Sequence, residues 1–360
     1  MSNFSTYRVE DATATSGPDF EALVAARNLT LEYDKAHYGH IDLVSSQASF
    51  NAWLVDQTYS FKRLYLIKQG DEFVGSVQVS GGLKDNTRLA YADVLAHNED
   101  SEVLRFGYEL VEAVAQEENR TTLNTYLAHT VEPAEDDPNY LASPTGIGSV
   151  DKSDPDVSVL LSSGWELEQT ERYSMLRLPV APDIVKPLET AAARKAEDEY
   201  ELVQWISETP EQYIDGHARL QQAMSTDVPS AGLDIEETVF DAARIKYFEE
   251  QMKARSKQYL AIAAVHKASG DLAGFTRVEF SDDKPESVMQ EETLVLKEHR
   301  GHSLGMWLKT VLVQELVALR PQAKRIHTWN AGENSYMLSI NVALGFTKQG
   351  IEGAWQKKLS

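Results

Sequence analysis

The chain has 360 residues, 42% of them hydrophobic, and a formal net charge of -22 from 56 acidic and 34 basic residues. This length exceeds what one hydrophobic core usually supports, so we expect two folded domains. The negative charge disfavours nucleic acid and anionic membranes as partners, because both carry charges of the same sign.

Cysteine is absent, which excludes disulfides, thiolate metal sites and a cysteine nucleophile. Residues 1–11 lack the basic and apolar regions of a signal peptide. No stretch approaches the length of a membrane-spanning helix. We therefore expect a cytoplasmic protein.

The first half of the chain shows strand-like and helical segments in alternation. A turn at Gly70 and Asp71 between two apolar runs predicts an antiparallel hairpin. Ser101 is the expected N-cap of the helix. The predicted segments are strands over 64–67, 73–79 and 90–96 and a helix over 101–117.

Two segments are typical of connectors. Residues 131–155 are rich in Pro, Gly, Ser and Asp and show little periodicity, which predicts a long loop. Residues 179–199 contain three prolines and then an alanine- and charge-rich run, which predicts an interdomain linker or a short helix. We therefore place one domain at 1–180, a linker at 181–199 and a second domain at 200–360.

The second half repeats the order of the first. Its expected elements are strands over 259–265, 273–280 and 293–296 and a helix over 303–319. Each half then has a glycine followed by an aromatic residue, Gly164–Trp165 and Gly345–Phe346. Corresponding elements of the two halves lie roughly 180 to 200 residues apart, which indicates duplicated domains and not a short-period repeat. The fold class predicted is α/β, with an α+β type of mixed, mostly antiparallel sheet flanked by helices in each half.

Residues 290–306 read QEETLVLKEHRGHSLGM, which predicts a strand, a turn of small residues and a helix N-terminus. Several free backbone N–H groups would then face one side and form an anion pocket, reinforced by the helix dipole. Arg300 adds a positive charge. A turn of this kind, taken alone, is more often only a turn.

Residues 325–346 read RIHTWNAGENSYMLSINVALGF, which predicts a strand over 326–329 and a helix from Asn334 to a closing Gly345. Together the two stretches resemble the GCN5-related N-acetyltransferase family, in particular tandem-domain actinobacterial-type members, with distant similarity to mycothiol synthase. The resemblance covers residues 200–360, and the specific motifs cover about 290–346. It implies a tandem pair of such domains and acetyl-CoA as acyl donor.

The resemblance also implies roles for individual residues. The strand that contains Val295 would pair with the pantetheine arm, with the Val295 amide facing the thioester carbonyl. The turn after it would wrap the pyrophosphate, and three asparagines would flank the cofactor on its other side. The implied cofactor-binding residues are Leu294, Val295, Leu296, Arg300, Gly301, His302, Ser303, Leu304, Gly305, Met306, Asn330, Asn334 and Asn341.

Two positions depart from the family pattern. Ser303 stands where the turn usually has glycine, and a small serine is tolerable there. Asn341 stands where many members carry a tyrosine that protonates the departing thiolate, and asparagine is not a useful acid. Tyr336 on the same helix is a candidate substitute, although a packing aromatic is the commoner role, and solvent is another proton source.

The matching turn in the first half is residues 97–102, HNEDSE. It has neither arginine nor glycine, and three acids occupy the place of a pyrophosphate, where like charges would weaken binding. We therefore expect residues 1–180 to be a degenerate copy of the domain without a CoA pyrophosphate loop.

The implied reaction is direct attack of a primary amine on the acetyl thioester in a ternary complex, which needs a base to take the amine proton. Glu279, Glu292 and His327 are candidates, and Glu291 is preferred because a period of two puts it on one strand face with Val295. The acceptor is expected to be a small cationic molecule. Residues 223–248 should help to bind it, through Met224, Asp227, Asp234, Glu236, Glu237 and Asp241.

Two alternatives remain open. The chain could be a CoA-binding pseudoenzyme, with Asn341 marking lost chemistry, or a mycothiol-synthase-like acyltransferase. Metal-hydrolase, dinucleotide and kinase motifs are absent from the sequence, so no metal ligands are predicted. A tandem pair can mimic a dimer internally, so we expect a monomer.

Overall fold

A computed structural model describes residues 3–359. Within that range the main strands form one twelve-stranded sheet in the order β1-β2-β3-β4-β5-β14-β8-β13-β12-β11-β10-β9. The strands are β1 (Phe4–Arg8), β2 (Ser60–Gln69), β3 (Glu72–Gly82), β4 (Leu89–Ala96), β5 (Thr122–His129), β8 (Glu166–Arg177), β9 (Tyr200–Ile206), β10 (Lys257–His266), β11 (Leu272–Ser281), β12 (Ser287–Val295), β13 (Arg325–Ala331) and β14 (Thr347–Lys358). A separate hairpin contains β6 (Tyr140–Ala142) and β7 (Ser149–Asp151).

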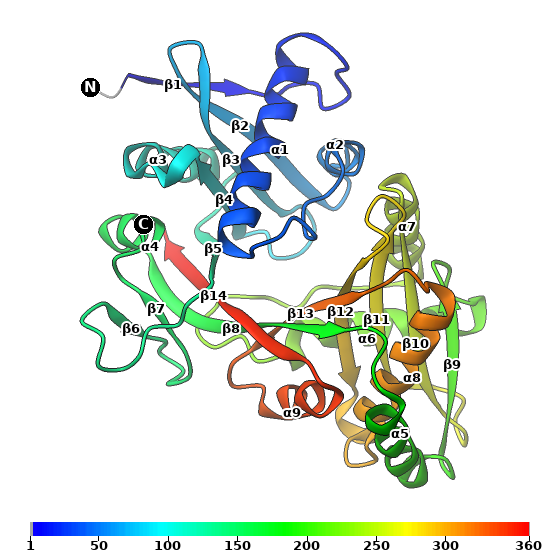
Figure 1. Cartoon of the computed structure of the whole chain (residues 1–360). Helices are drawn as coiled ribbons and strands as arrows, with labels where there is room; N and C mark the ends of the chain where they lie inside the picture. Colours follow the sequence, from blue (N-terminus) through cyan, green and yellow to red (C-terminus); the bar gives the residue numbers. More distant parts are fainter. Residues whose placement is uncertain (1–2, 360) are drawn as a thin grey trace.

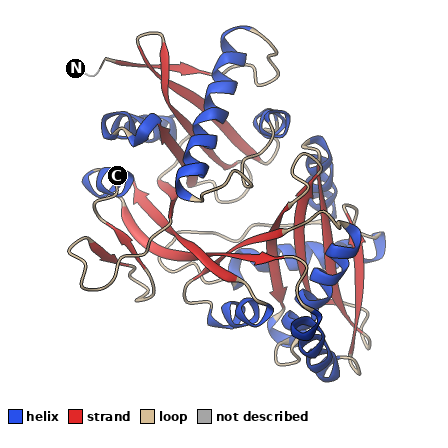
Figure 2. Ribbon diagram, viewed as in Figure 1, coloured by secondary structure: helices blue, strands red, loops and turns tan. Residues whose placement is uncertain are grey.

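The helices cover the sheet in both halves of the molecule (Figures 1 and 2). They are α1 (Gly17–His37), α2 (Gln47–Val55), α3 (Ser101–Glu117), α4 (Pro155–Ser162), α5 (Pro182–Ala196), α6 (Ile214–Asp227), α7 (Ala242–Ala254), α8 (Leu304–Leu319) and α9 (Ser335–Leu344). Helix α3 packs on β3 and β4, and α8 packs on β10 and β11. The predicted linker contains α5, which packs against α8. In the described range, no helix is both long and apolar enough to cross a membrane.

The prediction of a mixed, mostly antiparallel sheet with flanking helices is confirmed. Strands β4 and β5 are parallel, and so are β12 and β13, whereas all other neighbours in the large sheet are antiparallel. The two parallel pairs occupy equivalent places in the two halves. This symmetry in space follows the repeat seen in the sequence.

The last strand of each half is exchanged with the other half. Strand β14 pairs with β5 of the N-terminal half, and β8 pairs with β13 of the C-terminal half. The two exchanged strands also pair with each other. The halves therefore share one continuous sheet, and they cannot separate without breaking backbone hydrogen bonds.

Local predictions at the helix ends are mostly confirmed, with one correction. Helix α3 spans the predicted residues, but its N-cap is Asp100 and not Ser101. The Asp100 side chain accepts hydrogen bonds from the N–H groups of Glu102 and Val103 at 2.8 and 3.2 Å. Asparagine 334 caps α9, and Gly345 ends that helix at a φ of 98°, a conformation that glycine tolerates best.

Candidate functional site

Strands β12 and β13 separate soon after they begin. Their parallel pairing covers only Ser287–Met289 and Arg325–His327. Both strands continue well beyond this point, to Val295 and Ala331. The backbone edges in the opening between them are therefore free to bind an extended ligand.

A groove of about 500 Å³ lies at the outer end of this opening, within the range of small-molecule sites. Its walls come from the end of β12, the turn before α8, the start of α9 and the end of α6. The residues that were predicted to bind cofactor and that line it are Leu294, Val295, Arg300, Gly301, Ser303, Leu304, Gly305 and Asn334, and Tyr336 joins them.

The turn before α8 presents unpaired backbone donors. Gly301 has a φ of 93°, and Ser303, the N-cap, is left-handed with a φ of 58° and makes no side-chain capping bond. In the described range, none of the N–H groups of residues 301–306 donates a hydrogen bond. Successive free N–H groups at a helix N-terminus attract anions, because the helix dipole adds to their partial charges.

Arg300 is held beside this turn. Its Nε donates to the Val295 carbonyl at 3.1 Å, and its Nη2 lies 3.0 Å from Asp227 Oδ2. Lys297 Nζ lies 2.8 Å from the other oxygen of the same carboxylate. Asp227 thus orients two cations at the groove without neutralising both.

The free backbone edge of β12 faces the opening. The Leu296 N–H donates to Ala273 of β11, so the alternation of an antiparallel ladder turns the N–H and C=O of Val295 away from β11. The Val295 carbonyl is occupied by Arg300. Its N–H group points to the side of the opening, as the sequence resemblance implies for the amide beside a thioester.

The remaining predicted cofactor residues do not line the groove. Leu296 is buried in the core, and Met306 packs against a core cluster. His302 lies with its ring centroid 5.2 Å from that of Tyr200. Asn330 lines a second pocket, and Asn341 is buried beneath it.

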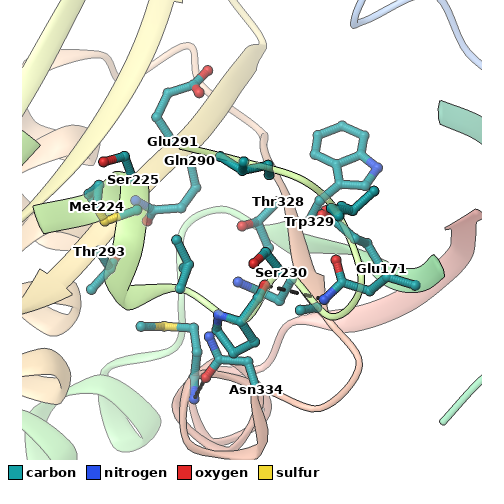
Figure 3. A pocket seen from close by; sticks show the side chains of 18 of the residues that line it. Glu171, Met224, Ser225, Ser230, Gln290, Glu291, Thr293, Thr328, Trp329 and Asn334 are labelled. Carbon is teal, nitrogen blue, oxygen red and sulfur yellow. Dashed lines mark hydrogen bonds between the residues drawn. The ribbon is translucent and has the colours of Figure 1, made fainter. Parts of the chain in front are cut away.

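This second, inner pocket of about 270 Å³ adjoins the groove (Figure 3). The two spaces share five wall residues and lead from the start of α8 towards the centre of the molecule. The shared residues are Val228, Pro229, Thr293, Asn334 and Met337. A ligand in the groove could therefore meet a second ligand in the inner pocket.

Lys309 of α8 lines the inner pocket, although the sequence analysis did not select it. Its side chain is 1% exposed, and its Nζ donates to Asn341 Oδ1 at 2.6 Å. Asn341 Nδ2 in turn donates to Asn330 Oδ1 at 2.7 Å. Burial without a carboxylate partner lowers the pKa of Lys309 to about 7. A signal existed in the sequence, since Lys309 falls on the apolar stripe of its helix between Gly305 and Leu312.

The prediction that Glu291 shares a strand face with Val295 is wrong. A β-bulge places Glu291 and Glu292 opposite the single residue Arg277, because Thr276 pairs with Thr293 and Val278 with Gln290. The extra residue shifts the alternation. In Figure 3 the Glu291 carboxylate points away from Thr328 and Asn334.

Glu291 is a wall residue of the inner pocket, but its side chain lies on the opposite face and is exposed. Desolvation and the neighbouring charges of Glu279 and Glu292 raise its pKa to about 7. The other two carboxylates are engaged, because Arg277 binds Glu292 at 2.6 and 2.7 Å and lies 3.2 Å from Glu279. Of these three glutamates, Glu291 is the one that forms no ion pair with residues 3–359.

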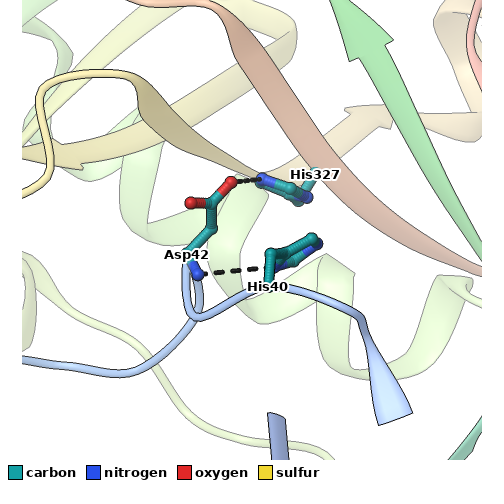
Figure 4. Close-up of side chains that lie close together, drawn as sticks. All are labelled: His40, Asp42 and His327. Atoms are coloured by element: carbon teal, nitrogen blue, oxygen red, sulfur yellow. Dashed lines mark hydrogen bonds and ion pairs between the residues drawn. The ribbon is translucent and has the colours of Figure 1, made fainter. Parts of the chain in front are cut away.

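His327 belongs to a closed ring of hydrogen bonds (Figure 4). The amide of Asp42 donates to His40 Nδ1 at 3.3 Å, and His40 Nε2 lies 2.8 Å from the Tyr173 hydroxyl. That hydroxyl lies 2.7 Å from His327 Nδ1, and His327 Nε2 lies 3.1 Å from Asp42 Oδ2. One neutral tautomer of each histidine satisfies every bond, which ties the loop after α1 to β8 and β13.

His40, Asp42 and His327 have possible metal-ligand atoms within 4.8 Å of one another. Arg325 binds the Asp42 carboxylate at 2.6 and 3.2 Å, so a metal ion there would meet a guanidinium group. The ring is better explained as a structural connection, and His327, which is fully buried, does not face the inner pocket.

The acids predicted in residues 223–248 are mostly engaged elsewhere. Asp234 and Glu236 contact Arg88 of the N-terminal half, and Asp241 caps α7. Asp227 holds Lys297 and Arg300. Met224 is the member of this set that lines the inner pocket.

The equivalent turn in the N-terminal half has its donors occupied. The Asp100 carboxylate binds the first N–H groups of α3, where an anionic ligand would otherwise bind. A second carboxylate, Glu102, stands in the first turn. Residues 97–102 therefore lack glycine and arginine and also present carboxylates where a pyrophosphate would bind.

Comparisons with known proteins agree with this architecture. No family model matches the chain, and no curated protein sequence is significantly similar to it. Among solved structures, the chain resembles a tandem GNAT protein from the clavulanic acid biosynthesis pathway, with 21% identity, a TM-score of 0.72, and coverage of 99% of this chain and 98% of that one.

Two further solved structures have the same fold. A GCN5-related N-acetyltransferase from Sphaerobacter thermophilus has 11% identity and a TM-score of 0.58, with coverage of 99% and 96%. The GCN5-related glucosamine N-acetyltransferase region of a fungal multi-domain GH3 beta-N-acetylglucosaminidase has 12% identity and a TM-score of 0.61, covering 98% of this chain and 38% of that one. The chain therefore has the tandem fold of the GCN5-related N-acetyltransferases.

Proposed function

We propose that the protein is an N-acetyltransferase that moves an acetyl group from acetyl-CoA to a primary amine of a small cationic molecule. The observation that carries this proposal is the row of unpaired N–H groups at residues 301–306, at the end of a groove between separated strands. The division into a degenerate domain (1–180), a linker (181–199) and an acetyl-CoA domain (200–360) is part of the same proposal.

The groove suits the chemistry of CoA. The pyrophosphate would receive the N–H groups of residues 301–306 and the charge of Arg300. The amides of the pantetheine arm would pair with the free edge of β12 near Val295, as an added strand does. The acetyl group would then lie where the groove adjoins the inner pocket.

In the proposed reaction the neutral amine attacks the thioester carbonyl, a C–N bond forms and the C–S bond breaks. The Val295 N–H would stabilise the developing oxyanion. The amine proton goes to a base, for which Glu291 through a water molecule stays the predicted candidate. The thiolate takes a proton from Lys309, which we prefer to Tyr336 because Lys309 lies in the inner pocket, whereas Tyr336 is 59% exposed in the outer groove.

Acetyl transfer to a panel of primary amines, followed as release of free CoA, tests the proposal. We expect amine-dependent release by the wild type and a large loss in Lys309→Met. If the wild type binds acetyl-CoA but acetylates no amine, the protein is a CoA-binding pseudoenzyme and the proposed reaction is wrong. Activity restricted to a cysteine-bearing pseudo-disaccharide would favour the mycothiol-synthase-like alternative.

A further inference from the structure

Four carboxylates lie near the junction of the two halves, and one of them, Glu171, lines the inner pocket. They are Asp34 of α1, Asp93 of β4, Glu171 of β8 and Glu352 of β14. None of them forms an ion pair with any residue of 3–359, although ion pairs are common elsewhere in the molecule. Asp34 is buried, Glu171 and Glu352 are half-buried, and Asp93 is exposed and accepts a hydrogen bond from Gln78 at 3.2 Å. A buried charge without a partner is costly, so Asp34 in particular calls for an explanation.

Two of these carboxylates face each other directly. Glu171 and Glu352 are partners across the β8–β14 ladder, and like charges in that relation are destabilising. Burial, with Glu171 as the nearest like charge, raises the pKa of Glu352 to about 8. The hydroxyl of Tyr38 donates to Glu352 at 3.1 Å. No group among residues 3–359 donates a hydrogen bond to the Glu171 carboxylate.

Asp34 is the most enclosed of the four. Its side chain is 6% exposed, and within the described range no group donates a hydrogen bond to its carboxylate. It lines a cavity of about 330 Å³ together with Asp93, Tyr38 and Trp329. Burial and the charge of Asp93 raise the pKa of Asp34 to about 7.

Two cations lie near this cavity, and the charge of Lys284 partly offsets that of Asp34. Arg27 also lines it, but its Nε donates to the Ser45 carbonyl at 3.1 Å. The ammonium of Lys284 donates to the Ile41 carbonyl. Both groups thus stabilise the loop that follows α1, and neither forms an ion pair with Asp34.

Trp329 lines both this acidic cavity and the inner pocket, so the two spaces adjoin at this side chain. It stacks on Tyr173 with ring centroids 4.7 Å apart, and the ring of Tyr38 lies almost perpendicular to it with centroids 6.2 Å apart. Aromatic faces and carboxylates together favour organic ammonium groups. The two spaces in series would suit an extended ligand.

We propose that the acidic cavity of Asp34, Asp93, Tyr38 and Trp329 binds the distal ammonium group of the acceptor, which is a linear diamine or polyamine. This inference rests on the proposed acetyltransferase function, since it places the reacting amine in the inner pocket. Binding of the distal ammonium favours ionised carboxylates, so it releases protons near neutral pH and weakens as the pH falls below about 7.

Isothermal titration of the full chain with 1,4-diaminobutane, spermidine and 1-butylamine tests the cavity without any acetyl transfer. We expect wild type to bind at least one of the two multiply charged amines about tenfold or more tighter than 1-butylamine. Asp34→Asn should remove that preference, while the exposed Asp183→Asn should keep it. Titration in buffers of different ionisation enthalpy should show proton release on binding in the wild type and in the Asp183→Asn control. Asp34→Asn should show none.

Three results would overturn the inference: no binding of either multiply charged amine, equal binding of 1-butylamine, or an unchanged preference in folded Asp34→Asn. Complete competition by millimolar MgCl₂ would instead assign the carboxylates to a metal ion and also contradict it. Failure of the proposed function is separate, because it shows as absent acetyl-CoA binding or transfer, whereas these titrations contain no acetyl-CoA. Thermal unfolding establishes that the variants are folded.

Discussion

Replacing Lys309 by methionine should stabilise the protein while it abolishes transfer. Methionine is nearly isosteric and carries no charge. Lowering a lysine pKa from 10.5 to about 7 corresponds to about 5 kcal/mol of unfavourable free energy for holding the ammonium in the folded state. The lost hydrogen bond leaves Asn341 Oδ1 without its donor, which costs about 1–3 kcal/mol. The net gain expected is about 2–4 kcal/mol.

The pH dependence follows from the direction of the shift. Below about pH 7 lysine is charged in both states, so the full penalty is present in the folded state. Between about pH 7 and 10.5 the folded lysine is neutral and the unfolded one is charged, so the penalty shrinks as the pH rises. Lys309→Met should therefore exceed wild type in stability at pH 6 and lose that advantage near pH 10.

Urea unfolding followed by tryptophan fluorescence at pH 6 and pH 9.5 measures this difference. The exposed Lys195→Met serves as the control and should show no comparable pH-dependent gain. A Lys309→Met variant that is less stable than wild type at pH 6 would refute the reasoning. It would mean that the buried ammonium contributes more through its contacts than its desolvation costs.

Further predictions concern the two halves and their junction. Glu352→Gln should raise the melting temperature more at pH 8.5 than at pH 5, because the raised pKa of Glu352 destabilises the folded state as the pH rises towards 8; an equal change at both pH values would contradict this. Asp100→Ala should cost about 1 kcal/mol of stability through the lost helix cap, with unchanged acetyl-CoA affinity, and a loss of affinity would place a ligand there. Tyr173→Phe removes the hydroxyl shared by His40 and His327 and should cost about 1–3 kcal/mol in urea unfolding, whereas unchanged stability would show that the ring is not a structural connection.

The elements that depend on neighbouring residues were predicted well from the sequence. The helix over 101–117, the end of α9 at Gly345 and the hairpin around Gly70 all follow from local capping and turn preferences. The exchange of β8 and β14 was not predicted, because it depends on pairing between strands that lie far apart in the chain. No local pattern encodes such a choice of partner.

The candidate site likewise combines features set by neighbouring residues, which were predicted, with features set by distant residues, which were not. The turn before α8 lines the groove through Arg300, Gly301 and residues 303–305, because strand, turn and helix start are contiguous in the sequence. Glu291 was misplaced because one extra residue in a bulge shifts every side chain on one side of it. The acidic cavity could not be predicted, since Asp34 and Asp93 come from two distant elements and look like ordinary surface acids in the sequence.

Calorimetric titration of acetyl-CoA tests the central proposal most directly. Three proteins are compared: the wild type, a double variant that carries both Arg300→Ala and Ser303→Glu, and a control variant, Ser101→Glu, changed at the matching helix of the N-terminal half. We predict one binding site in the wild type, its loss in the double variant, and unchanged binding in Ser101→Glu. An added carboxylate at Ser303 would occupy the free N–H groups as Asp100 does in α3. Absent binding to the wild type, or equal binding to a folded double variant, would contradict the assignment of the groove to acetyl-CoA.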